Sequence, residues 1–113
     1  MQIREITAII RSGKWSDTAR ELRAAGFHAV TRQRALGRGK QKGLSRGGGG
    51  VRVRLLPKWL LSLAVEEGQV EAAVEALIRA NRTGEIGDGK IFVSPVGGVL
   101  RVRTEETGYP ALC

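Results

Sequence analysis

The sequence has few of the residues that form metal sites, disulfides or aromatic binding surfaces. Cysteine and histidine occur once each among 113 residues, as Cys113 and His28, which excludes an intrachain disulfide and argues against a thiolate metal site. Aromatic residues make up only 4% of the chain, whereas RNA-recognition sheets display aromatic side chains. No paired-carboxylate, Ser/His/Asp or Cys/His set has a pattern typical of catalysis, so we do not expect an enzyme.

Long hydrophobic runs are also missing. No apolar stretch approaches the roughly 18 residues that a membrane-spanning helix requires. Arg4 and Glu5 interrupt the first apolar segment, which is unlike a signal peptide. We therefore expect a cytoplasmic protein without membrane insertion, built as a single domain over residues 1–113.

Acidic residues are absent from Leu22 through Val65, although the whole chain has 11 of them beside 19 lysines and arginines. Nine of the basic residues lie between positions 31 and 58: Arg32, Arg34, Arg38, Lys40, Lys42, Arg46, Arg52, Arg54 and Lys58. The rest of the chain has ten basic and eleven acidic residues, so the net charge of +8 arises from this segment. It should attract an anion, which could be a nucleotide, a small carboxylate, a nucleic acid or an acidic protein surface. A solvated basic loop is the alternative.

The first half of the chain predicts a strand, a helix, a second strand and a long loop. The strands are expected over Ile3–Ile10 and about His28–Leu36, because β-branched and apolar residues dominate both. Apolar residues at helical spacing predict a helix over Trp15–Ala25. Residues 37–54 are rich in glycine and have no strong period. A mobile loop of this length is uncommon in a small domain unless it is functional.

The second half predicts a strand over Leu55–Val65, a helix over Val70–Ile78 and strands over Lys90–Val96 and Val99–Arg103. Two glycines between the last two strands are typical of a hairpin. The full order predicts an α+β, ferredoxin-like βαββαβ sandwich with a C-terminal hairpin strand. The strand over 55–65 is apolar at nearly every position, which predicts that both sheet faces are covered and that the chain oligomerises through its sheets.

A glycine-rich turn spans residues 83–93 and reads Thr-Gly-Glu-Ile-Gly-Asp-Gly-Lys-Ile-Phe-Val. Gly84, Gly89 and Lys90 satisfy the G-x-x-x-x-G-K part of a P-loop. However, Ile91 stands where a P-loop needs Ser or Thr for magnesium, and the order is helix, loop, strand. We therefore expect a tight turn whose acid and lysine face a ligand or a neighbouring chain.

Several segments together resemble the PII nitrogen-regulatory signal-transduction proteins, in register over essentially the whole chain. The segments are residues 37–43 (Gly-Arg-Gly-Lys-Gln-Lys-Gly), 56–58 (Leu-Pro-Lys), 83–93 and 101–104 (Arg-Val-Arg-Thr). The resemblance implies a homotrimer of ferredoxin-like subunits, with ATP and ADP competing for the clefts between subunits. It also implies a T-loop, here about residues 37–54, that docks onto a target protein. Many members sense 2-oxoglutarate through magnesium-ATP, and the sequence is also similar to the branch encoded beside nitrogenase genes.

The resemblance places site residues by position. Nucleotide-binding residues would be Thr31 near the adenine, Gly39, Lys40 and Gln41 at the start of the T-loop, Gly87, Asp88, Gly89 and Lys90 in the B-loop (about 82–90), and Arg101 and Arg103 from a neighbouring subunit. Residues of the 2-oxoglutarate and magnesium site would be Gln41, Lys42, Gly43 and Lys58, with Gln41 reaching the magnesium through ATP. Arginines at i and i+2 of a strand share one side, so this pair could address one polyphosphate.

Some positions depart from the family pattern. Residues 44–54 contain no tyrosine, so control by tyrosine uridylylation should be absent. Lys40 stands where many members have arginine, and Arg38 replaces a common phenylalanine. Glu105 stands where glycine is usual, and an anion there would oppose ATP if it pointed into the cleft.

These observations favour a nucleotide-sensing regulator of a nitrogen-metabolism target, which could be an enzyme, a transporter or a nitrogenase component. One alternative is a sensor of energy state, through ADP or AMP, with a target outside nitrogen metabolism. The other is a basic nucleic-acid-binding module, because the cationic segment could attract a phosphate backbone. The lack of an aromatic motif argues against that module.

Overall fold

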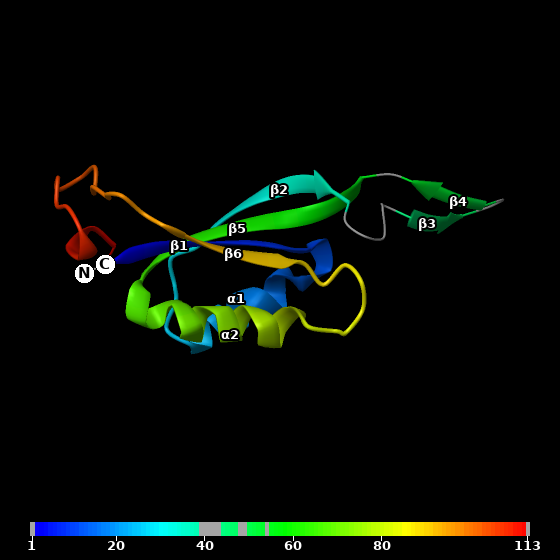
Figure 1. Cartoon of the computed structure of the whole chain (residues 1–113), viewed down its shortest axis with the longest axis horizontal. Coiled ribbons are helices and arrows are strands. Elements are labelled where there is room, and N and C mark those ends of the chain that lie inside the picture. The colour runs from blue at the N-terminus through cyan, green and yellow to red at the C-terminus, as the bar shows by residue number, and fades with distance from the viewer. Residues whose placement is uncertain (1, 39–43, 48–49, 54, 113) are drawn as a thin grey trace.

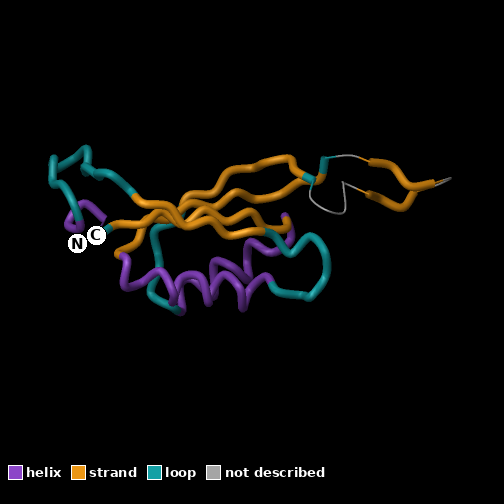
Figure 2. The backbone as a smooth tube through the Cα atoms, viewed as in Figure 1, coloured by secondary structure: helices purple, strands orange, loops and turns teal. Residues whose placement is uncertain are grey.

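The computed structural model describes residues 2–38, 44–47, 50–53 and 55–112. Its main sheet has four antiparallel strands in the spatial order β2-β5-β1-β6. The strands are β1 (Ile3–Arg11), β2 (Thr31–Gly37), β5 (Leu56–Glu66) and β6 (Lys90–Pro95). The helices are α1 (Trp15–Ala24) and α2 (Val70–Asn81), and both lie on one face of the sheet (Figures 1 and 2). The predicted ferredoxin-like α+β architecture is confirmed.

The core forms between this sheet face and the two helices. Alternate residues of β1 and β5 point toward the helices, which is the period expected of a strand with one buried face. The buried cluster consists of Ile6, Ala8, Ile10, Leu22, Leu61, Leu63, Val65, Ala73, Ala76 and Leu77. Alanines at two of the α2 positions let this helix pack closely on the sheet.

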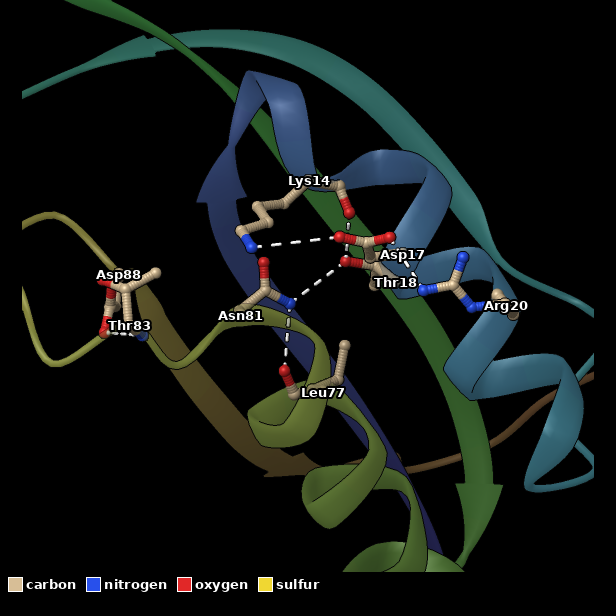
Figure 3. Close-up of polar contacts among 8 residues, drawn as sticks. All are labelled: Lys14, Asp17, Thr18, Arg20, Leu77, Asn81, Thr83 and Asp88. Carbon is tan, nitrogen blue, oxygen red and sulfur yellow. Dashed lines mark hydrogen bonds and ion pairs between the residues drawn. The ribbon is translucent and has the colours of Figure 1, made fainter.

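A polar clamp joins the two helices at the edge of the core (Figure 3). Thr18 of α1 and Asn81 of α2 are both buried, and the Asn81 amide donates to the Thr18 hydroxyl over 3.1 Å. The same amide nitrogen donates to the carbonyl of Leu77 at 2.9 Å, while the Thr18 hydroxyl donates to the carbonyl of Lys14 at 2.6 Å. The clamp therefore fixes the last residue of α2, where the glycine-rich turn begins.

Among the described residues, no α-helix lies on the opposite face of the main sheet (Figure 1). Its side chains come from the other alternate positions and include half-buried and exposed apolar groups such as Ile9, Leu60 and Phe92. Phe92 is 52% exposed, which is high for an aromatic side chain in a sheet. This face is where the predicted oligomerisation would take place.

Residues 37–54 contain more structure than the predicted loop. Leu44–Gly47 (β3) and Gly50–Val53 (β4) pair as an antiparallel two-stranded sheet. Figure 1 shows this hairpin beyond the ends of β2 and β5, away from the helices. The sequence did not predict these strands because each has only four residues and they flank the run of glycines at positions 47–50, which is typical of a loop.

The predicted strand over Val99–Arg103 is wrong. Residues 102–104 form a turn, and Leu100 makes only an isolated antiparallel bridge with Thr107. Glu105 in the same segment has a φ of 61°, the left-handed region that a glycine adopts without steric cost. The side chain of Glu105 therefore strains the backbone at this position. The second strand was also predicted three residues too early, since β2 begins at Thr31.

Candidate functional site

The glycine-rich turn connects the end of α2 to the start of β6 and is folded around the carboxylate of Asp88. This carboxylate accepts the backbone N–H of Thr83 at 2.7 Å and that of Gly84 at 2.9 Å. It also accepts a hydrogen bond from the Thr83 hydroxyl. These hydrogen bonds, the Thr83 hydroxyl first, lower the pKa of Asp88 from 3.8 to about 2. Asp88 therefore shapes the loop, and its carboxylate is occupied by the protein itself.

Arg11, the last residue of β1, anchors this loop to the sheet. Its guanidinium donates to the carbonyl of Ile86 at 3.0 Å and forms a longer ion pair with Asp88 at 3.4 Å. The Nε of Arg11 is buried and has no hydrogen-bond partner among the described residues. The sequence reasoning did not identify Arg11. The only signal in the sequence was a charged residue at the end of the apolar segment Ile3–Ile10.

Gly89 allows the loop to approach the backbone of β1. Its φ is +113°, and a Cβ atom placed on it would overlap the carbonyl oxygen of Ile9 and lie 3.1 Å from the Ile9 carbonyl carbon. The next residue, Lys90, then enters the sheet directly opposite Ile9. Only glycine fits at position 89 without moving the loop away from the sheet.

Strand pairing places three cations at one corner of the helix-free face. Lys58 on β5 is the direct register partner of Arg11 on β1, and Lys90 lies opposite Ile9, two residues before Arg11. Direct cross-strand neighbours are about 5 Å apart and diagonal neighbours about 7–8 Å apart. Burial, and secondarily the positive charge of Arg11, lower the pKa of Lys58. An anion at this corner would relieve that repulsion.

A cavity of about 320 Å³ lies on the other side of the loop, between α2 and β6. Apolar side chains such as Val74, Leu77 and Ile91 line it, and Asp88, Gly89 and Lys90 contribute from the loop. Lys90 therefore borders both this apolar cavity and the cationic corner.

The structure does not bring the other described site candidates to this corner. Thr31 is on β2 and Lys90 is on β6, which are the two opposite edges of the sheet. Three strand spacings of about 4.8 Å separate these edges. Arg101 and Arg103 follow the far end of β6, and Figure 1 shows their segment at the opposite end of the sheet from the B-loop. Within one chain the candidates form at least two separate groups.

Arg101 and Arg103 also lack the predicted strand geometry. Arg101 donates to Glu106 at 3.1 Å and to the carbonyl of Pro110 at 2.8 Å, whereas Arg103 is exposed. They lie in and beside a turn, so alternation along a strand does not align them. The candidates Gly39, Lys40, Gln41, Lys42 and Gly43 lie outside the described residues.

Substituting Gly89 tests the close approach of the loop to β1. Gly89→Ala should lower the free energy of unfolding by about 3 kcal/mol or more, because it adds an overlap to the cost of a left-handed alanine. Gly84→Ala is the matched control, since Gly84 has a φ of +88° but open space around it. Its cost should be about 1–2 kcal/mol. Equal losses for the two variants in urea unfolding would refute the role of the contact with Ile9.

The hydrogen bonds to Asp88 predict a dependence of stability on pH. Because the folded-state pKa is depressed to about 2, ionised Asp88 stabilises the fold fully above its unfolded value of 3.8, and this contribution is lost as the pH falls through about 2. Urea titrations of the wild type and Asp88→Asn should give a stability difference that is largest above about pH 5 and narrows toward about pH 2. A difference that does not change with pH would contradict this role.

The chain was compared with known proteins. The family model described as "Nitrogen regulatory protein P-II" matches residues 3–106. A nitrogen regulatory protein P-II 2 of Methanothermobacter thermautotrophicus is 41% identical, with 97% of each chain covered. A "Nitrogen fixation nifHD region glnB-like protein 2" of Methanococcus maripaludis is 40% identical over 97% of this chain and all of that protein.

A solved structure has the same fold. The crystal structure of Arabidopsis thaliana PII bound to citrate superposes with a TM-score of 0.81 and is 33% identical, with 97% of this chain and 92% of the other covered. The chain belongs to the PII family of nitrogen-regulatory signal-transduction proteins.

Proposed function

We propose that this protein binds adenine nucleotides in clefts between the subunits of a homotrimer and regulates a target protein through the segment 37–54. The observation that carries the proposal is the cationic corner formed by Lys58, Arg11 and Lys90 beside the tightly folded B-loop. Three positively charged side chains suit a polyphosphate. The carboxylate of Asp88 is already hydrogen-bonded to the loop. PII proteins are regulatory signal transducers, and we propose regulation rather than catalysis here as well.

The separation of the site candidates supports a site between subunits. One copy presents Lys90 at its β6 edge, while Thr31 is at the β2 edge. A head-to-tail ring sets one edge of each copy against the other edge of the next, and closes without free interfaces. Arg103, exposed at the far end of β6, would reach the corner of a neighbour in such a ring. The half-apolar, helix-free sheet face would then be covered at the centre of the trimer.

The second effector is proposed to be a small dicarboxylate. Lys58 could bind this dicarboxylate. Burial and the charge of Arg11 lower the pKa of Lys58, and a bound carboxylate would favour its charged form again. The PII structure of Arabidopsis thaliana contains citrate, which is itself a small polycarboxylate. We propose 2-oxoglutarate as the ligand, held with magnesium and ATP through Gln41, Lys42 and Gly43. Gln41 can supply an amide oxygen, a ligand type that magnesium accepts.

The regulated target is proposed to belong to nitrogen metabolism, because the relatives are named for nitrogen regulation and for the nifHD region. It could be an enzyme, a transporter or a nitrogenase component. No helix within the described residues is long and apolar enough to cross a membrane. We propose that the protein acts in the cytoplasm. Nucleotide exchange would change the population of T-loop conformations, and a target that prefers one of them would read the change.

Thermal melts with ATP, ADP, AMP and 2-oxoglutarate test the nucleotide site. A ligand at about 100 times its dissociation constant should stabilise the folded protein by roughly 2.7 kcal/mol. Lys90→Ala should reduce the shift by ATP while its melting temperature without ligand stays close to that of the wild type. Arg23→Ala is the control, because it removes an exposed cation from α1. No shift with any adenine nucleotide, or an unchanged shift in Lys90→Ala, would refute the proposal.

A further inference from the structure

Two arginines on β2 are stacked against both tryptophans of the chain. The guanidinium of Arg32 lies 4.6 Å from the ring centre of Trp15 and 4.3 Å from that of Trp59. The guanidinium of Arg34 lies 5.5 Å from the ring centre of Trp59. These four residues, defined here as the Arg–Trp ladder, come from β2, β5 and the first turn of α1. They lie on the helix side of the sheet, away from Lys58 and Lys90.

The tryptophans form a fixed support for the arginines. Trp15 and Trp59 are half-buried and pack against the core cluster. The indole N–H of Trp59 donates to the carbonyl of Ser12 at 3.0 Å, so its ring orientation is held. A stacked guanidinium keeps its N–H groups at the edge of the plane free for an acceptor. Arg32 and Arg34 are thus exposed but pre-organised.

No carboxylate of the described residues neutralises these arginines. Neither Arg32 nor Arg34 is in an ion pair there, and the sequence has no acid from Leu22 through Val65. The acids of α1 are already paired, Asp17 with Arg20 at 2.8 Å and Glu21 with Arg79 at 3.3 Å. Two uncompensated charges on an ordered support indicate an anionic partner.

The spacing of the arginines suggests the shape of that partner. Residues at i and i+2 of a strand point to the same side and are about 6.4–6.8 Å apart along it. Carboxylates at i and i+2 of an extended peptide have the same spacing. Each guanidinium can receive one carboxylate through two parallel hydrogen bonds.

A nucleic acid fits the ladder less well. Single strands bind by stacking their bases on free aromatic faces. Here guanidinium groups lie over the rings of both tryptophans, and the Trp59 N–H is already bonded within the protein. The groups left for a ligand are guanidinium edges, which favour planar carboxylates.

We propose that the Arg–Trp ladder is a docking surface for an extended, carboxylate-rich segment of a partner protein. The surface is part of the folded body and is separate from both the B-loop and the hairpin β3–β4. It would add affinity to a contact made through the T-loop, since two linked contacts bind more tightly than either alone. Its existence does not depend on nucleotide binding.

The binding test uses a peptide of alternating Glu and Thr and its Gln-Thr counterpart, without nucleotide. The chain has two tryptophans, and both are in the ladder, so intrinsic fluorescence reports directly on the surface. The acidic peptide should produce a saturable change in emission, and the amide peptide should not. An unchanged emission with the acidic peptide, or tighter binding of a thymidine oligonucleotide, would overturn the proposal.

Variants are compared by the anisotropy of the labelled acidic peptide, with circular dichroism as a check of folding. Arg32→Gln with Arg34→Gln should weaken binding by about tenfold or more. Arg20→Gln with Arg23→Gln removes the same charge from exposed positions of α1 and should weaken it by less than about threefold. If the two double variants lose the same affinity for the peptide, the effect depends only on net charge and the proposal is overturned.

Replacing both ladder arginines by lysine keeps the charge and removes the planar fork. Arg32→Lys with Arg34→Lys should weaken binding by about threefold to tenfold, because a lysine pairs as a point charge. If the glutamine double variant does not fold, this lysine double variant still tests the proposal. Affinity equal to that of the wild type would overturn the role of stacking.

Discussion

The carboxylate of Asp88 is the interaction on which the candidate site depends. It collects the N–H groups of Thr83 and Gly84, the Thr83 hydroxyl and the guanidinium of Arg11. Because Arg11 also holds the carbonyl of Ile86, the loop is fixed to the end of β1. The absence of a side chain at Gly89 lets the chain then enter the sheet beside Ile9. The position of Lys90 follows from these contacts.

This fixed corner is only part of a nucleotide site. The antiparallel order β2-β5-β1-β6 sets Thr31 and Lys90 on opposite edges, and the direction of β6 carries Arg101 and Arg103 away from the B-loop. No side-chain rotation can cross a four-stranded sheet. Under the proposed function, nucleotide binding and assembly of the trimer are therefore linked, and a ligand in the cleft would stabilise the interface.

The sequence predicted the parts of the fold that are runs of β-branched and apolar residues or that repeat at helical spacing. The strands β1, β5 and β6 and both helices follow such patterns, so their positions were predicted to within a few residues. The hairpin β3–β4 was missed because each strand has only four residues beside the four consecutive glycines at positions 47–50, so the Val-Arg-Val alternation of β4 is too short to predict a strand. The C-terminal segment was misjudged, because a pair of glycines suggests a hairpin whether or not a second strand follows. Its chain instead turns at residues 102–104.

Contacts between distant positions were less predictable than elements. Lys90 and Gly89 could be selected from a motif, whereas Arg11 is brought to the loop by the pairing of β1 with β6, 75 residues from its partner Ile86. The Arg–Trp ladder likewise needs β2, β5 and α1 to meet. The resemblance rests on residues 37–43, 56–58, 83–93 and 101–104, and neither Arg11 nor the residues of the ladder lie in these segments.

A subunit-mixing experiment tests most directly whether the site lies between subunits. Lys90→Ala and Arg103→Ala chains would be refolded separately and as an equal mixture, and ATP binding would be measured by titration calorimetry. If the two residues act in one site from different copies, each variant alone binds weakly, and random mixing restores the wild-type affinity at about a quarter of all sites in the equal mixture. If the mixture binds no better than the two variants alone, the intersubunit site is contradicted.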